Sequence, residues 1–217
     1  MQWIDVYATM YQKANGFPVT ILAKPNNKKG YLSMKPTTRA AYDLSMRENS
    51  IDGIITVDDI TTQIQAGDVF FLNTDPINIY IIQTCSYWEQ QPDTRNINAI
   101  KVNCLVNIQR YGFKDETSTK EEWYDVYQNV YGFISEVLKD SKNFNAGMEI
   151  ATVKSVQIPK LDINKNMYMV QENDRILVSN LLDLNYKIKI QIESMDSFGV
   201  QGVIRLQGTQ DMRNDNG

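Results

Sequence analysis

Two pairs of neighbouring carboxylates are the residues of this sequence best suited to acid–base chemistry. Asp58 and Asp59 are adjacent in the chain, as are Glu121 and Glu122. A pair of carboxylates hydrolyses a glycosidic bond only when the two groups face each other across a cleft, about 5–10 Å apart. Adjacency in the sequence does not supply that placement. We therefore expect no enzyme, no cofactor and no metal site.

The chain contains no histidine and only two cysteines, Cys85 and Cys104. Without histidine, Ser-His-Asp and Cys-His nucleophilic sites and most zinc sites are excluded, whereas carboxylate or lysine chemistry stays open. The cysteines flank a candidate hairpin whose turn lies at residues 92–96. Because the sequence has no secretory feature, we expect two buried thiols rather than a disulfide.

Charge is distributed unevenly along the chain. The formal net charge is −4, but residues 1–50 contain seven basic and three acidic groups, so that segment is +4 and the remainder −8. An acidic chain is not expected to bind nucleic acid by neutralising phosphates. Lys28 and Lys29 lie in a basic loop, and Asp58 and Asp59 in an acidic one. Each loop is interpreted as solvated, with contact to a phosphate or a partner as the alternative for the basic loop.

Amphipathic helices are predicted in two segments, residues 2–14 and the stretch after residue 118. Residues 2–14 place apolar side chains at three- and four-residue spacing. Residues 37–50 are compatible with a shorter helix. Residues 118–121 form a capping-box pattern. The apolar residues that follow it predict a helix of about 20 residues: Trp123, Tyr127, Val130, Ile134, Val137 and Leu138.

The rest of the chain is β-rich. Alternation is strictest at residues 186–193, which predicts a half-buried strand. Strands are predicted at residues 19–23, 31–34, 51–57, 69–72, 77–88, 100–109, 150–158, 176–178, 186–193 and 200–206. Residues 213–217 have no apolar group to anchor them, so we expect them to be poorly ordered. No window approaches the roughly 18 consecutive apolar residues of a membrane span.

Together these elements predict an α+β fold, with antiparallel sheets or a small β-barrel and two amphipathic helices packed on them. Residues 1–115 are expected to form a helix plus β-rich region, and residues 116–217 a long helix plus hairpin that completes the same fold. The alternative is a tandem duplication of one domain.

The duplication hypothesis comes from two similar stretches at residues 3–11 and 123–131, which are identical at five of nine positions. Their offset is 120 residues, whereas a second match, Asp68 and Asp174, is offset by 106. A single duplication would need an insertion of fourteen residues to explain both. We therefore favour two independently patterned helices, each burying its tryptophan and exposing its aspartate.

The order of the segments resembles that of neck proteins of tailed bacteriophages, of the tail-terminator or head-closure (stopper) type. Residues 16–21, 30–35 and 102–109, the long helix after them and the strand at residues 186–193 are similar to terminators. Residues 37–100 depart from that pattern, and residues 48–80 resemble instead the small β-barrel of head-closure proteins. The resemblance leaves both neck positions open.

This resemblance implies a non-enzymatic structural protein of the virion, assembled in the host cytoplasm. It would form a ring, usually sixfold, that closes the head or terminates the tail tube and lets DNA pass. In such a ring the loop with Asp58 and Asp59, or the loop with Lys28 and Lys29, would face the lumen or a neighbouring ring. Its expected partners are further copies of itself, neighbouring neck, portal-adaptor or tail-tube proteins and, transiently, the genomic DNA, but no membrane. The alternative is a structural component of a baseplate or injection machine.

Overall fold

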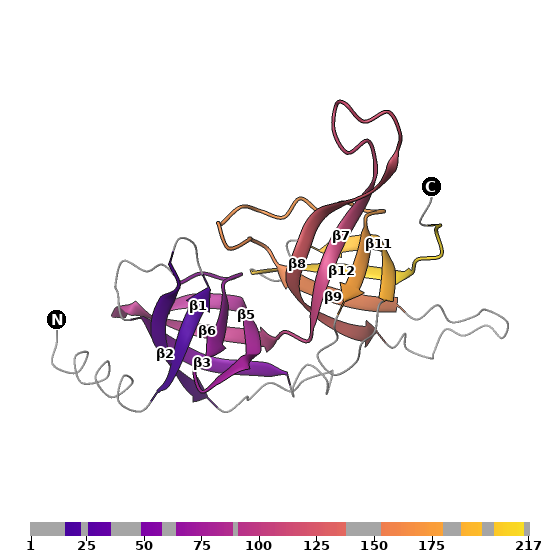
Figure 1. The fold of residues 1–217 in the computed structure, drawn as a ribbon. Coiled ribbons are helices and arrows are strands. Elements are labelled where there is room, and N and C mark those ends of the chain that lie inside the picture. The colour runs from indigo at the N-terminus through magenta and orange to yellow at the C-terminus, as the bar shows by residue number, and fades with distance from the viewer. Residues whose placement is uncertain are drawn as a thin grey trace, which may run out of the picture. The chain divides into compact units, whose positions relative to one another are not determined.

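The computed structural model describes residues 16–22, 26–35, 49–57, 64–88, 91–137, 153–179, 188–196 and 202–214. Its regular elements are twelve strands (Figure 1): β1 (Phe17–Leu22), β2 (Lys28–Lys35), β3 (Ser50–Val57), β4 (Val69–Leu72), β5 (Asp75–Trp88), β6 (Gln91–Lys101), β7 (Cys104–Gly112), β8 (Glu122–Val137), β9 (Val153–Pro159), β10 (Arg175–Ser179), β11 (Ile188–Asp196) and β12 (Val203–Gln210). These ranges contain no helix, and therefore no helix that could cross a membrane.

The first six strands close into an antiparallel barrel in the order β1-β2-β3-β6-β5-β4. Strand β1 follows the period of two, because its inward-facing side chains are buried and their neighbours along the strand are not. In β1, Val19 and Ile21 are buried while Thr20 between them is half-buried. The barrel core contains Val19, Ile21, Leu32, Ile55, Val57, Ile64, Phe70, Leu72, Tyr80, Ile82, Ile97 and Ala99.

The last six strands close into a second antiparallel barrel, in the order β10-β11-β12-β9-β8-β7. Val106 and Ile108 of β7 are fully buried, as are Ile176 of β10 and Ile192 of β11. The chain forms two compact units, and the first boundary between them lies between residues 102 and 103. Residues 159–168 also belong to the first unit.

The two barrels have one topology. When the strands of each barrel are counted in chain order, the ring runs first, second, third, sixth, fifth, fourth in both. Strand β1 therefore corresponds to β7, β2 to β8 and β4 to β10. Closure leaves neither sheet with an unpaired edge, so the β-strand edges of both barrels are satisfied within the chain.

The same turn precedes the fourth strand of each barrel. In the first barrel the Gln65 amide donates to the Asp68 carboxylate (2.9 Å), and the Asp68 amide donates back to the Gln65 carbonyl (3.2 Å). Gly67 between them has a positive φ of 96°, which glycine adopts at no steric cost. The Gly67 amide and the Asp68 carbonyl then pair with the backbone of Ile82 in β5.

In the second barrel the equivalent turn runs from Gln171 to Asp174. The Gln171 amide donates to the Asp174 carboxylate (2.8 Å), and the Asp174 amide to the Gln171 carbonyl (3.2 Å). Asn173 has φ 71° where the first barrel has glycine; asparagine is among the residues that tolerate this region. Asn173 and Asp174 pair with the backbone of Ile192 in β11. The sequence match of Asp68 with Asp174 thus marks equivalent turns.

The predicted α+β fold with two packed helices is wrong for the described chain. The segment predicted as the long helix is strand β8, paired with β7 and β9. Its aromatic and β-branched residues favour a strand. Two register shifts against β7 give β8 one extra residue each, and Asn129 lies there with φ 55°. Bulges interrupt the alternation, and the three-residue step from Tyr127 to Val130 therefore imitates helical spacing.

The predicted hairpin is present, but its turn does not lie at residues 92–96, because β5 is already paired with β6 at Trp88 and Gln91. Residues 91–101 form strand β6, which pairs with β5, whereas β7 pairs with β8 and β10 in the other barrel. Cys85 lies opposite Ile97 and Cys104 opposite Gly132, so the two cysteines are not neighbours. Both are free thiols; Cys104 is buried and Cys85 half-buried.

Several predicted strands are confirmed, including residues 51–57 within β3 and residues 69–72 as β4. The predicted helices at residues 2–14 and 37–50 fall almost entirely outside the described residues, as do Asp58 and Asp59.

Candidate interaction site

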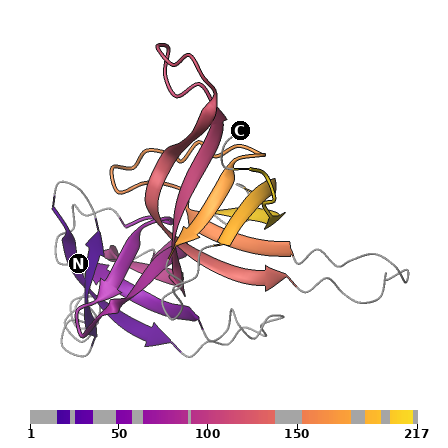
Figure 2. The ribbon, with the colours of Figure 1, turned by 45° about the vertical axis from the view of Figure 1, so that its right-hand side comes forward.

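The second barrel carries a projecting hairpin, which we call the arm and define as residues 111–123. It consists of the outer ends of β7 and β8, where Tyr111 pairs with Trp123 and Gly112 with Glu122, and of the turn at residues 113–121. Figures 1 and 2 show the arm standing out from its barrel. Phe113 at the start of the turn is 54% exposed and Tyr111 42%. An exposed aromatic pair on a projecting hairpin is a surface suited to protein contacts.

Hydrogen bonds within the turn fix its tip. One carboxylate oxygen of Asp115 accepts from the Thr117 amide (3.0 Å), the Thr117 hydroxyl (2.6 Å) and the Ser118 hydroxyl (3.0 Å). These bonds, led by the Thr117 hydroxyl, lower the pKa of Asp115 below its ordinary value. Ser118, predicted as a helix cap, is instead part of this turn. The tip is therefore an ordered structure at neutral pH, with its carboxylate ionised.

Trp123 anchors the base of the arm. The guanidinium carbon of Arg175 lies 3.8 Å from the centroid of the Trp123 ring, and that of Arg213 lies 4.7 Å from it. The Tyr111 ring packs against Trp123 with centroids 5.4 Å apart. The indole Nε1 donates to the carbonyl of Asn214 (3.2 Å). Attraction between each cation and the face of the ring joins the arm to β10 and to the C-terminal segment.

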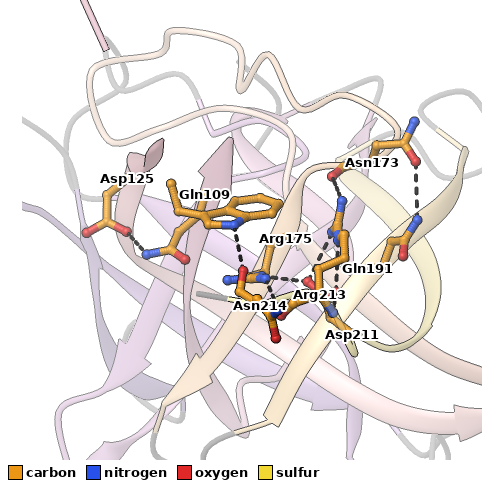
Figure 3. Close-up of polar contacts among 9 residues, drawn as sticks. Gln109, Asp125, Asn173, Arg175, Gln191, Asp211, Arg213 and Asn214 are labelled. Atoms are coloured by element: carbon orange, nitrogen blue, oxygen red, sulfur yellow. Dashed lines mark hydrogen bonds and ion pairs between the residues drawn. The ribbon is translucent and has the colours of Figure 1, made fainter. Parts of the chain in front are cut away.

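A buried ion pair holds this cluster together (Figure 3). Arg175 Nε donates to Asp211 Oδ2 at 2.5 Å, and both side chains are at most 1% exposed. Arg213 donates through Nε and Nη2 to the two oxygens of Asp211, at 2.8 and 3.0 Å. Arg175 also reaches the Arg213 carbonyl (3.0 Å), and Arg213 the Asn173 carbonyl (2.9 Å). One carboxylate thus pairs with two guanidinium groups, and it supplies the counter-charge that the buried Arg175 requires, whereas Arg213 is partly exposed.

The environment of Asp211 keeps it ionised. Burial alone would raise its pKa, but hydrogen bonds from the side chain and amide of Arg213 and from Arg175 outweigh that effect and lower the pKa to about 2. The cluster is therefore fully charged at neutral pH, and its ion pairs persist across the physiological range.

A second contact secures the other side of the arm's base. Arg110, next to Tyr111, donates through Nε and Nη2 to the two oxygens of Asp174, each at 2.9 Å. Asp174 belongs to the turn that precedes β10. The bidentate geometry defines both distance and orientation. On the first barrel the equivalent Asp68 forms an ion pair with Lys165 instead.

The outer surface of β7 and β8 below the arm is polar. Gln109 donates to Asp125 (2.7 Å; Figure 3), and Gln128 donates to the other oxygen of the same carboxylate (2.7 Å). Asp125 is exposed, as predicted, and Trp123 is half-buried rather than largely buried. The corresponding Trp3 and Asp5 lie outside the described residues.

The residues predicted to face a lumen or partner are placed as follows. Lys28 and Lys29 begin β2, where Lys28 is half-buried and Lys29 exposed, and Lys29 pairs with Thr20 of β1. Glu121 and Glu122 lie on the arm and are both exposed. Among the described residues, no group of three or more histidine, cysteine, aspartate or glutamate side chains is arranged to hold a metal ion.

Sequence reasoning missed the Arg175, Asp211 and Arg213 cluster. Arg213 had been assigned to a poorly anchored C-terminus, but it is held by three side-chain hydrogen bonds, two to Asp211 and one to Asn173. An aspartate followed two residues later by an arginine is common, so the sequence carried no specific signal. Only the barrel brings both next to Arg175, which is 36 residues from Asp211 in the chain.

Fold and site together define a chain of two closed six-stranded antiparallel barrels with a single topology, the second of which carries an anchored arm. No protein-family model and no curated protein matches the sequence. Among solved structures, the chain is similar to one described as the K. pneumonia MrkH–c-di-GMP complex, at 4% identity and a TM-score of 0.19, over 98% of this chain and 87% of that one. A similarity at that TM-score supports no conclusion about fold or ligand.

Proposed function

We propose that this protein is a structural component of the head–tail junction of a tailed bacteriophage, where copies assemble into a ring through which DNA passes. The observation that carries the proposal is the tandem of closed barrels with a projecting arm on the second. The resemblance to head-closure proteins rested on residues 48–80, and the described part of that segment contributes strands β3, β4 and β5 to the first closed barrel.

Closed barrels suit a ring component for a physical reason. Every strand edge of a closed barrel is paired within the barrel, so no free edge is available to pair with a sheet of another chain. Contacts with neighbours must then come from loops and hairpins, which can be altered without disturbing the barrel. The anchored arm is such an element, because its base is fixed by Trp123 and Arg110 while Phe113 and the acidic side chains of its tip are exposed.

The charge of the chain also supports this role. A formal net charge of −4 disfavours tight binding of the DNA backbone, which a wall rich in lysine and arginine would promote.

The shared topology and the equivalent turns at Asp68 and Asp174 further support an origin by tandem duplication of one barrel.

The test uses the phage that encodes the chain. A version carrying an affinity tag should co-purify with intact particles, and antibody-coated gold should label the point where head and tail meet. Disruption of the gene should leave heads and tails unjoined, and expression from a plasmid should restore joining. Labelling of the far end of the tail would instead favour the baseplate alternative. Absence of the protein from purified particles would refute both roles.

A further inference from the structure

The two barrels present opposite charges at equivalent hairpins. In the first barrel, the described residues after the β1–β2 turn include Lys28 and Lys29, at the start of β2. In the second barrel, residues 113–122 contain four carboxylates and two lysines, a formal net charge of −2. These carboxylates belong to Asp115, Glu116, Glu121 and Glu122, and all four side chains are exposed.

Each charged hairpin also offers an aromatic side chain. Phe113 lies at the start of the arm's turn and is 54% exposed. In β2, Lys29 and Tyr31 are two residues apart and therefore lie on one face of the strand, and Tyr31 is half-buried. Both hairpins thus combine an accessible ring, a kind of side chain that is enriched in protein–protein contacts, with charged side chains suited to the polar rim of a contact.

We propose that the arm of one copy docks on the β1–β2 hairpin of a second copy, with Glu121 and Glu122 opposite Lys28 and Lys29 and Phe113 packed near Tyr31. This inference rests on the proposed function and adds the contact that builds the ring. The two surfaces differ, so a pair of copies joined by this contact retains one unoccupied arm and one unoccupied β1–β2 hairpin for further copies. A contact of this heterologous kind generates rings or open filaments rather than closed dimers.

The charged side chains and Phe113 contribute differently to this contact. Ion pairs between exposed side chains contribute little affinity individually, because water and salt screen them. They determine which surfaces meet and how fast. Burial of Phe113 then provides most of the affinity, as aromatic anchors do in other interfaces.

A charge-exchange experiment on the full chain tests this contact. One variant reverses the arm (Glu121→Lys with Glu122→Lys) and another reverses the β1–β2 hairpin (Lys28→Glu with Lys29→Glu). Mass photometry and sedimentation velocity would measure association at low and high salt. The unmodified chain should associate, and less so at high salt. Each variant alone should associate at least about tenfold more weakly at low salt, because like charges then meet.

Recombining the charges should restore association. An equimolar mixture of the two variants allows alternating copies in which every arm meets a hairpin of opposite charge, and a chain carrying both reversals does the same with itself. Both should recover association to within about threefold of the original chain. A matched control, Glu172→Lys with Glu193→Lys, changes net charge by the same amount at exposed sites outside the arm and should associate normally. Phe113→Ser should weaken association at all salt concentrations.

Three results would overturn the proposal: a strictly monomeric wild-type chain, variants that associate like the original, or a mixture that fails to recover. Circular dichroism and thermal melting of each variant establish that it is folded. If the protein is found at the head–tail junction but charge exchange does not restore association, only the inferred contact fails. If restoration occurs but the protein is absent from particles, the proposed function fails and the contact stands.

Discussion

The guanidinium carbon of Arg175 lies 3.8 Å from the centroid of the Trp123 ring, so that a buried cation in the wall of the second barrel supports the base of the arm. The charge of Arg175 is balanced by Asp211, from the segment that follows the last strand. The end of the chain therefore helps to fix an element whose last residue, Trp123, lies 91 residues before Asn214 in the sequence.

Asp211→Asn should strongly destabilise the second barrel. The substitution leaves Arg175 buried, at 1% exposure, without its anionic partner, and breaking a buried pair from one side costs about 3–5 kcal/mol. Arg175→Met should cost less, because Asp211 keeps its two bonds from Arg213 and methionine fills part of the volume. Urea unfolding followed by circular dichroism measures both. Glu172→Gln, an exposed control, should unfold like the original chain, and equal costs for the two cluster variants would contradict this account.

Acid should weaken the fold through Asp211. The folded pKa is about 2 and an unfolded aspartate titrates near about 3.9, so the folded state binds its proton less readily. The contribution of the carboxylate is therefore fully present above about pH 4 and is lost as the pH falls towards 2. The difference in pKa corresponds to about 2 kcal/mol. Unfolding free energies measured between pH 5 and pH 2 should fall less steeply in Asp211→Asn than in the original chain. Parallel curves would rule out Asp211 as a contributor.

Gly208→Ala should prevent normal pairing of β11 and β12. A Cβ at this position would overlap the carbonyl oxygen of Gln191, and this backbone atom cannot move aside as the end of a side chain can. We expect a loss of about 3 kcal/mol or more, because the strands must separate locally. Gly112→Ala is the comparison, since a Cβ there meets nothing within 4 Å and the cost is that of its positive φ of 152° alone. Thermal unfolding should rank Gly208→Ala as clearly the less stable variant; the reverse order would refute the steric argument.

Cys104 should be inert in the folded protein. It is 1% exposed, and burial raises the pKa of its thiol to about 12, only partly opposed by a hydrogen bond involving the backbone of Ile134. Thiolate is the reactive form, so a Cys85→Ser variant, whose remaining thiol is Cys104, should react with an aromatic disulfide reagent at least about 100-fold more slowly when folded than in denaturant. The complementary Cys104→Ser variant reports on half-buried Cys85 and should react faster. Rapid labelling of folded Cys104 would show that the barrel opens readily there.

Part of the candidate site was within reach of the sequence. The pair Glu121-Glu122 is visible in the sequence as neighbouring carboxylates, and the pair Lys28-Lys29 as part of a solvated basic loop. Their relationship was not recognised, because it depends on β1–β2 and β7–β8 being equivalent hairpins of two barrels. The arm could not be predicted, because the spacing of residues 118–138 indicates a helix.

The sequence by itself determined short apolar strands that lie next to turn residues, such as those at residues 51–57 and 69–72, since an apolar run bounded by turn residues is a property of neighbouring residues. It also determined which chemistry is absent, because a chain without histidine cannot use that side chain. Only the tertiary structure decided that residues 122–137 form a strand, because bulges opposite β7 give its apolar residues a spacing that a helix would share. The structure likewise decided the pairing of Arg175 with Asp211 and the support of Trp123, since barrel closure brings together residues that no local pattern connects.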